Sequence, residues 1–269
     1  MKALCLRYGV TPGGYYAWCG REPSERALED KGLRVRIGSI FEASEGTYGS
    51  PRIHEVLRQA GVRVGRKRVA RLMREAGLKG RSARIYRRMP GTRRFFGDIP
   101  NRVLELKTTA PDQVWVGDVT YLKVGKCWRY LAVVLDRHSR RVLGWALRTR
   151  RDLALTLAAL NRAVSRRRGS SGLIFHSDRG VEFSAYAYRA RLAALSIVQS
   201  MKRPREIGDN AFIESFFHSM KAEAIHARVF THDRALREAV AGYIRRYNLT
   251  RLHSSLGYIS PIDYEKTVA

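Results

Sequence analysis

The sequence is poor in cysteine, in acidic residues and in long apolar runs. Its 269 residues include three widely spaced cysteines, Cys5, Cys19 and Cys127. This odd number argues against a disulfide framework and against a zinc site made of cysteines. The longest uninterrupted apolar run, residues 130–135, is far shorter than the ~20 residues that span a bilayer. Because Lys2 and Arg7 leave no room for the apolar core of a signal peptide, we expect a cytoplasmic protein with no membrane partner.

Basic residues outnumber acidic residues about two to one. The 24 Asp and Glu residues stand against 51 Lys and Arg residues, which gives a formal net charge of +27. Residues 63–94 concentrate this excess, with 13 basic residues and Glu75 as the single acid. Because 45% of the chain is hydrophobic, we expect a folded protein and not a disordered tail. A charge of this size predicts a polyanionic partner.

Two short amphipathic helices are predicted within this basic region. The first begins at Ser50-Pro51 and has apolar residues at helical spacing, Ile53, Val56, Leu57 and Ala60. The second follows a turn that contains Gly65, and its apolar side is made of Val69, Leu72, Met73 and Ala76. Its other side has four basic residues, Arg66, Lys67, Arg71 and Arg74. The pair has the form of a helix-turn-helix, and we expect the four basic residues to contact DNA phosphates.

Changes of pattern along the chain predict its domain boundaries. Residues 1–35 are expected to form an N-terminal helical segment, and residues 36–80 the helix-turn-helix domain. Residues 81–110 mix prolines, glycines and paired arginines without long periodicity, so we predict a basic linker there. Residues 111–269 form a second predicted domain, whose C-terminal helix is expected at about 233–247.

From residue 114 the sequence alternates between strands and helices. Residues that are β-branched or aromatic predict three consecutive strands with short turns, at 114–123, 128–135 and 141–148. There follow a helix capped by Asp152, a strand at 173–176, a helix at 184–194 and a strand at 196–199. Two more helices are predicted at about 210–224 and 233–247. The prediction is an α/β fold with a mixed five-stranded sheet, preceded by a small all-α region.

Three acidic residues lie where apolar residues would be expected. Asp118 is in the middle of the first strand, Asp178 directly follows the fourth, and Glu214 is one turn into a phenylalanine-rich helix. Each has an ordinary explanation: an ion pair with an arginine, a turn, and a solvated helix surface. Together they are three carboxylates on separate elements, as metal-ion chemistry on a phosphodiester needs. Lys221, seven residues after Glu214, lies on nearly the same helix face and is expected to hold a phosphate.

Several segments resemble the catalytic core of bacterial insertion-sequence transposases. They are residues 115–121 (WVGDVTY), 176–180 (HSDRG), 209–217 (DNAFIESFF), 221–223 (KAE) and 247–261 (YNLTRLHSSLGYISP). Residues 47–53 (TYGSPRI) and 66–78 (RKRVARLMREAGL) resemble the helix-turn-helix region of the same proteins. The resemblance covers roughly residues 40–264 and is closest to the second-frame (OrfB) transposases of insertion sequence family three, relatives of retroviral integrases.

This resemblance implies an RNase H-like integrase core in which Asp118, Asp178 and Glu214 form a DDE triad that binds two Mg²⁺ or Mn²⁺ ions. It implies that water cuts one DNA strand at the element end, and that the freed 3′-hydroxyl then attacks another phosphodiester without a covalent enzyme intermediate. It also implies that the element's ends are joined into a circle before integration. Four C-terminal residues would line the DNA near this site, Tyr247, Asn248, Arg251 and His253, unless they serve instead to pack the last helix.

The same resemblance implies double-stranded DNA as the partner, both as element ends and as target. A homo-oligomer on DNA is expected, since two ends must be handled. The chain starts without the long coiled-coil region of a complete fused transposase of this family, so we expect a second-frame product that works with a first-frame partner protein. The expected location is the bacterial cytoplasm, at the nucleoid.

Other functions are consistent with parts of the sequence. A retroviral-type integrase would bring a His-His-Cys-Cys zinc module, which Cys5, Cys19 and His54, the only histidine before residue 138, cannot build. A ribonuclease H would fit the metal chemistry but would not need the helix-turn-helix. A catalytically idle DNA-binding regulator derived from a transposase stays open, although the presence of all three acids does not support it.

Overall fold

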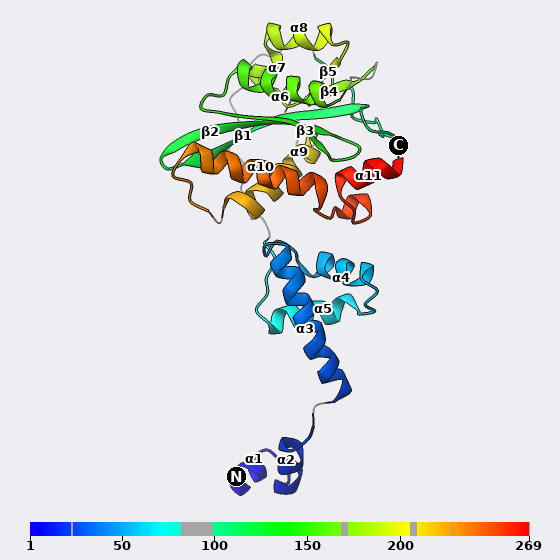
Figure 1. Ribbon diagram of the computed structural model, residues 1–269, viewed down its shortest axis with the longest axis vertical. Helices are drawn as coiled ribbons and strands as arrows, with labels where there is room; N and C mark the ends of the chain where they lie inside the picture. The colour runs from blue at the N-terminus through cyan, green and yellow to red at the C-terminus, as the bar shows by residue number, and fades with distance from the viewer. Residues whose placement is uncertain (23, 82–98, 168–171, 205–208, 227, 269) are drawn as a thin grey trace. The chain divides into compact units, whose positions relative to one another are not determined.

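A computed structural model describes residues 1–22, 24–81, 99–167, 172–204, 209–226 and 228–268 (Figure 1). The chain divides into two compact units, residues 1–81 and 82–269. Most of the predicted basic linker, residues 82–98, lies outside the described residues.

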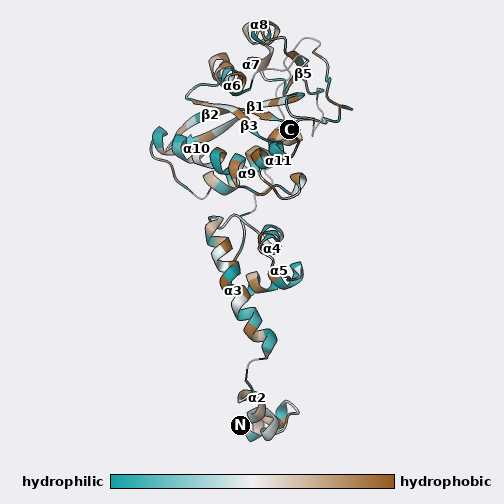
Figure 2. Ribbon diagram, turned by 45° about the vertical axis from the view of Figure 1, so that its right-hand side comes forward, coloured by the Kyte–Doolittle hydropathy of each residue, from teal (hydrophilic) through white to brown (hydrophobic). Residues whose placement is uncertain are grey.

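The first unit is helical over its described residues. Its elements are α1 (Lys2–Arg7), α2 (Pro12–Cys19), α3 (Glu25–Ala43), α4 (Ser50–Gln59) and α5 (Arg66–Glu75). Side-chain oxygens of Thr11 and Ser24 accept backbone hydrogen bonds at the starts of α2 and α3. Helix α3 runs without a break through residues 35 and 36, where the sequence predicted a boundary, and has polar and apolar residues along its length (Figure 2).

Helices α4 and α5 pack against each other and against α3. The predicted apolar sides are buried at five positions, Ile53, Leu57, Val69, Leu72 and Met73. Ala60 and Ala76 are exposed instead, because each directly follows the last residue of its helix. Ion pairs also join the helices, since Asp30 of α3 accepts from Arg68 at 2.7 Å and from Arg71 at 2.6 Å.

The described residues of the second unit form one five-stranded mixed sheet, as predicted. The strands are β1 (Val114–Val124), β2 (Cys127–Asp136), β3 (Val142–Arg148), β4 (Ile174–Ser177) and β5 (Val198–Met201), in the spatial order β3-β2-β1-β4-β5. The β1, β2 and β3 strands form an antiparallel meander. Strand β4 is parallel to β1, and β5 is parallel to β4.

Helices cover both faces of this sheet (Figure 1). On one face lie α6 (Leu153–Arg166), α7 (Val181–Ser184) and α8 (Tyr186–Ala194). On the other lie α9 (Ala211–Met220), which continues into the π-helical turn η1 (Lys221–Ile225), then α10 (Asp233–Leu249), the short 3-10 turn η2 (Ser254–Leu256) and α11 (Pro261–Val268). The predicted helix at 184–194 corresponds to α8, whereas the short helix α7 before it and α11 were not predicted.

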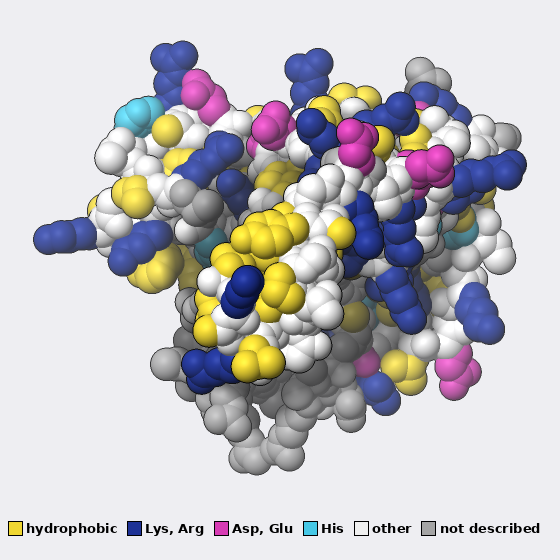
Figure 3. All heavy atoms as spheres, turned by 90° about the horizontal axis from the view of Figure 1, so that it is seen from below, with side chains coloured by type: hydrophobic (Ala, Val, Ile, Leu, Met, Phe, Trp, Pro, Cys, Tyr) yellow, Lys and Arg dark blue, Asp and Glu magenta, His cyan; other side chains and the backbone are white. Residues whose placement is uncertain are grey.

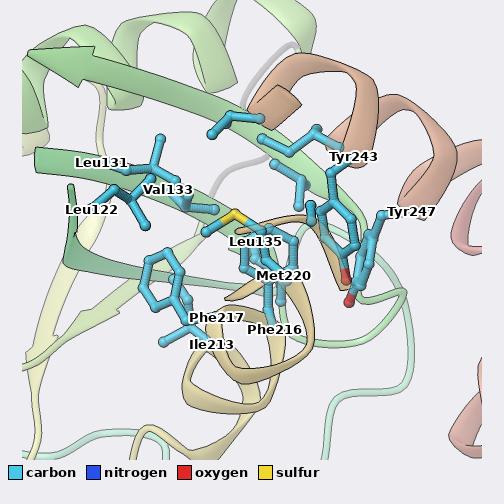
Figure 4. Close-up of a cluster of buried hydrophobic side chains, with 14 of the residues drawn as sticks. Leu122, Leu131, Val133, Leu135, Ile213, Phe216, Phe217, Met220, Tyr243 and Tyr247 are labelled. Atoms are coloured by element: carbon cyan, nitrogen blue, oxygen red, sulfur yellow. The ribbon is translucent and has the colours of Figure 1, made fainter. Parts of the chain in front are cut away.

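The alternation of side chains along β1 separates two apolar cores. Val114 and Val116 face α9 and α10, whereas Trp115 faces α6 and α8. On the α9 side, apolar residues of the strands pack against apolar residues of α9, and two tyrosines of α10 lie beside them (Figure 4). The strand residues include Leu122, Leu131, Val133 and Leu135, the α9 residues are Ile213, Phe216, Phe217 and Met220, and the tyrosines are Tyr243 and Tyr247. This packing fixes α9, and with it Glu214, against the strand that bears Asp118.

Candidate active site

Asp118 and Asp178 occupy neighbouring positions on adjacent parallel strands. The register between β1 and β4 ends with Gly117 opposite Ser177, and each aspartate is the next residue of its chain segment. Neighbouring strands lie about 4.8 Å apart, so the two aspartates start from adjacent backbone positions. Both side chains are half-buried. By alternation along β1, Asp118 points to the face covered by α9.

Gly117 allows the close packing next to Asp118. A Cβ atom at this position would collide with the ring of Phe175, which fills the core on the α6 side of the sheet. The absence of a side chain at Gly117 therefore lets β1 and β4 keep the register that places the two aspartates side by side.

The two carboxylates are held by backbone groups and carry unfavourable like charge. An Oδ1 atom of Asp118 accepts from the Val119 N–H at 2.7 Å, and an Oδ1 atom of Asp178 accepts from the Gly180 N–H at 3.0 Å. Burial raises the pKa of Asp118 to about 8, and the negative charge of Asp178 adds to this rise. Burial also raises the pKa of Asp178. A nearby cation would favour the ionised form of both.

Glu214 lies on α9, and its negative charge interacts with Asp118. Its neighbours Ile213, Phe216 and Phe217 are buried against the sheet, while Glu214 itself is half-buried. After burial and the charge of Asp178, the negative charge of Glu214 further raises the pKa of Asp118. Within the described residues, no three His, Cys, Asp or Glu side chains are close enough together to hold one metal ion. The structure thus groups the three acids around one region without showing an assembled metal centre.

Lys221 reaches the same region from the first residue of η1. Its Nζ atom lies 4.7 Å from the centre of the Tyr121 ring. Burial lowers the pKa of Lys221, and the negative charge of Asp118 opposes this shift. The seven-residue spacing from Glu214 therefore does place a cation beside the carboxylates.

Arg151 and Glu182 belong to this region, and the sequence analysis missed both. Arg151 forms an ion pair with the buried Glu182, and its positive charge lowers the pKa of both Asp118 and Asp178. A Cβ atom on Gly180 would lie within 3.2 Å of side-chain atoms of Asp178, Glu182 and Arg151, so these groups surround it closely. The proximity of Glu182 to the HSDRG segment was a signal, whereas nothing in the arginine-rich stretch at 148–151 distinguished Arg151.

The four C-terminal residues expected either to line DNA or to pack the last helix are buried. Tyr247, Asn248, Arg251 and His253 all lie inside the second unit. The side chain of Asn248 accepts from the Val142 N–H and donates to the Val142 carbonyl, each at 2.9 Å, as a neighbouring strand would. The rings of Tyr247 and His253 are in edge-to-face contact, with centres 4.5 Å apart. Their role in the structure is to pack α10 and the following segment against the sheet.

Arg251 is the most tightly held of these four. Its guanidinium donates from Nη2 to Glu223 Oε1 at 2.6 Å and from Nε to both carboxylate oxygens. Arg246 also reaches Glu223, at 3.3 Å. Because Glu223 is part of η1, this buried ion pair connects the C-terminal segment to the turn that carries Lys221.

The four basic residues predicted for the helix-turn-helix differ in their surroundings. Arg66, Lys67 and Arg74 are exposed on α5. Arg71 is half-buried, and its two terminal nitrogens are bound to Asp30 at 2.6 Å and Glu75 at 2.7 Å. Arg71 therefore joins α5 to α3 through its ion pair with Asp30.

Comparison with known proteins finds similarity along nearly the whole chain. Family models described as integrase core domain match residues 108–206 and 195–261, and one described as HTH-like domain matches residues 27–86. Transposase InsF for insertion sequence IS3A of Escherichia coli (strain K12) is 36% identical over 98% of this chain and 93% of its own. The insertion element IS600 uncharacterized 31 kDa protein of Shigella sonnei is 36% identical over 98% of this chain and 97% of its own.

Among solved structures, one similar chain comes from the simian T-cell lymphotropic virus intasome in complex with PP2A regulatory subunit B56 gamma. It aligns with a TM-score of 0.52 and 14% identity over 85% of this chain and 74% of its own. At this identity the likeness supports the fold alone. A search of the described residues finds no helix long and apolar enough to cross a membrane.

Proposed function

Because the chain belongs to the insertion sequence IS3 family of transposases and carries their integrase core domain, we propose that Asp118, Asp178 and Glu214 are its catalytic residues. The reaction is cleavage of a DNA strand at the ends of the element, followed by transfer of the freed 3′-hydroxyl to another phosphodiester. The observation that supports these residue roles is the register of β1 and β4, which puts two aspartates side by side on the face covered by α9.

The three acids fit a pair of divalent metal ions, Mg²⁺ or Mn²⁺. Carboxylate oxygens are the hard ligands that these ions prefer. The pKa of Asp118, raised by burial and by the charge of Asp178, fits a site that is completed by a cation. When bound, two such ions lower the pKa of the attacking hydroxyl and stabilise the charge on the attacking and leaving oxygens. Asp118, Asp178 and Glu214 would hold them.

Two cationic side chains of this chain act on the substrate beside the acids. The ammonium group of Lys221 contacts the Tyr121 ring and interacts with the charge of Asp118. In this position it would hold a DNA phosphate. Arg151 stays paired with Glu182 and keeps positive charge next to both aspartates, which limits their mutual repulsion. Lys221 would position the DNA backbone, and Arg151 would favour the charged form of both aspartates.

The N-terminal unit is proposed to bind duplex DNA through α5. Arg66, Lys67 and Arg74 are exposed on that helix and would contact phosphates, which positions the protein without reading sequence. In the view of the whole chain in Figure 3, Lys and Arg side chains are more prominent than acidic ones, as the net charge of +27 leads one to expect. Binding should therefore weaken steeply as salt is added, because each neutralised phosphate releases counterions.

Organisation and partners are proposed on the same basis. Residues 1–80 contain the N-terminal segment and the helix-turn-helix, residues 81–110 the linker, and residues 111–269 the catalytic core. The protein would act in the bacterial cytoplasm as a homo-oligomer that holds two DNA ends, with a first-frame protein as a further partner.

A cleavage and strand-transfer assay tests this function. Oligonucleotides that carry the element's own ends are incubated with the full chain and Mg²⁺ or Mn²⁺, and products are separated by size. The unaltered protein should cut and join, and Asp118→Asn, Asp178→Asn and Glu214→Gln should each abolish both steps. Glu238→Gln, a change of an exposed acid on α10, is the matched control and should keep full activity.

Equal activity in the three variants would show that other residues carry the reaction. Binding of the ends by the unaltered protein without any cutting, in either metal, would identify the chain as an idle DNA-binding regulator.

A further inference from the structure

Two aromatic side chains on the β1–β2 hairpin are exposed and touch each other. Tyr121 is 58% exposed and Trp128 is 49% exposed. Their ring centres are 5.2 Å apart and the rings are nearly perpendicular, at 89°. Among the described residues of the second unit, the one other aromatic with comparable exposure is Tyr186 on α8. Apolar ring surface of this size is normally removed from water, so a pair of exposed rings calls for a ligand.

Each ring of this pair is accompanied by a lysine. The Nζ atom of Lys221 lies 4.7 Å from the centre of Tyr121, and that of Lys123 lies 5.7 Å from the centre of Trp128. Cations at these distances are attracted by the ring faces. Exposed rings flanked by positive charge match a ligand that combines flat apolar surface with negative charge. A nucleotide has both, whereas an apolar protein surface lacks the charge.

The pair lies close to the proposed catalytic acids. Tyr121 follows Asp118 by three residues on one strand, which corresponds to about 10 Å along β1. Lys221 contacts the Tyr121 ring and also interacts electrostatically with Asp118. In the described part of the sheet, β4 pairs with β1 only as far as Gly117, so Tyr121 lies on the part of β1 that extends beyond β4.

We propose that Tyr121 and Trp128, with Lys123 and Lys221, bind unpaired bases of the DNA strand next to the cleavage point. Bases within a duplex are covered on both faces by their neighbours, so stacking on these rings requires bases that have left the helix. At the duplex spacing of 3.4 Å per nucleotide, about three nucleotides cover 10 Å, and a more extended unpaired strand would need fewer. The bound bases therefore lie within three nucleotides of the scissile phosphate. This inference rests on the proposed function, which locates the scissile phosphate at Asp118 and Asp178.

Binding to two DNA probes tests the site. One probe is a fully paired duplex, and the other has the same length with three unpaired nucleotides at one end. Full-length protein is titrated against each by fluorescence anisotropy at one salt concentration. The unaltered protein should prefer the forked probe, and Tyr121→Ala and Trp128→Ala should each reduce that preference about tenfold, since base–aromatic stacking has this size. Tyr121→Phe and Trp128→Phe keep an aromatic face and should keep most of the preference.

Tyr186→Ala is the matched control, because it removes an exposed aromatic from α8, and it should leave the preference unchanged. A measurement on the unaltered protein avoids the risk that an alanine variant folds poorly: the forked probe should quench tryptophan fluorescence, and Trp128→Phe should remove that quenching. Equal fork preference in the alanine variants and the unaltered protein would overturn the proposal, as would quenching that survives Trp128→Phe. Failure of the unaltered protein to cut DNA in Mn²⁺ is a separate result and would count against the proposed function.

Discussion

The buried ion pair between Glu223 and Arg251 should be costly to break and much less costly to replace. The side chains are 4% and 5% exposed, and the guanidinium makes three hydrogen bonds to the carboxylate. Removing one partner leaves the other charge buried without compensation, which typically costs about 3–5 kcal/mol. The two single substitutions should lower the free energy of unfolding by different amounts. Arg251→Met leaves Glu223 with Arg246 at 3.3 Å, whereas Glu223→Met deprives two arginines of their shared acid.

Arg251→Met should therefore lie near the lower end of this range, at about 3 kcal/mol, and Glu223→Met near the upper end. For a unit of about 190 residues, each kcal/mol lowers the melting temperature by roughly 2–4 °C, so the losses are about 6–20 °C. The double variant with methionine at both positions replaces the pair by apolar groups, which is often nearly neutral. The single losses sum to about 8 kcal/mol, so a nearly neutral double variant would show a coupling of several kcal/mol between the two side chains.

Thermal and urea unfolding of the four proteins, followed by circular dichroism, would measure this coupling. Arg234→Ala is the control, because its ion pair with Glu238 is exposed and should contribute nothing measurable. Single losses that simply add in the double variant would refute the reasoning, since they would show that the two charges do not compensate each other.

Three further predictions follow from individual contacts. Gly117→Ala should destabilise the second unit by about 1–3 kcal/mol through the collision with Phe175. Gly32→Ala, at an open position of α3, should instead raise the melting temperature. Equal shifts in melting temperature for the two variants would contradict the assigned packing. Arg66→Ala should lower the slope of log binding constant against log salt by about 1 on duplex DNA, and Arg71→Ala should leave the slope unchanged while weakening the first unit; a lower slope for Arg71→Ala would restore it as a phosphate contact. The hydrogen bond from Arg203 lowers the pKa of Asp209 to about 2, below its unfolded value. This carboxylate therefore stabilises the fold above about pH 4, and the contribution disappears as the pH falls towards 2. Asp209→Asn should flatten the plot of melting temperature against pH between about pH 4 and 2, and an unchanged plot would count against the contact.

The strands, most helices and the three acids could be predicted from local sequence. β-Branched and aromatic residues between short turns indicated β1, β2 and β3, and an acid in the middle of β1 stood out because an apolar residue would be expected there. Helix α11 was missed although its signal was present: Ser260 precedes Pro261, and its Oγ accepts from the Asp263 N–H at 3.1 Å as a capping residue does. The π-helical turn η1 had no such signal.

Residue roles that depend on distant partners could not be predicted. The sequence did not reveal the role of Asn248, because its partner, the backbone of Val142, is 106 residues away in sequence. In the sequence, Arg71 belongs to the same basic helix side as the exposed residues of α5. What distinguishes it is its ion pair with Asp30 of α3, 41 residues earlier in the chain. In a strongly basic chain, a polar residue can bind DNA or stabilise the fold. Which of the two it does depends on tertiary contacts, and local sequence patterns do not contain these contacts.

The part of β1 beyond β4 explains how one strand can serve both the acids and the aromatic pair. Strand β1 pairs with β4 up to Gly117 and continues to Val124, so seven residues extend past that pairing. Because side chains alternate along a strand, Asp118 faces α9 while Tyr121 and Lys123 face the opposite side. Lys221 reaches the ring of Tyr121 from the α9 side, so this edge of β1 is where the two faces meet. A DNA strand that crosses the edge would have its phosphate at the acids and its next bases at the rings. Cleavage and stacking would then both use this extension of β1, through Asp118 for cleavage and through Tyr121 and Lys123 for stacking.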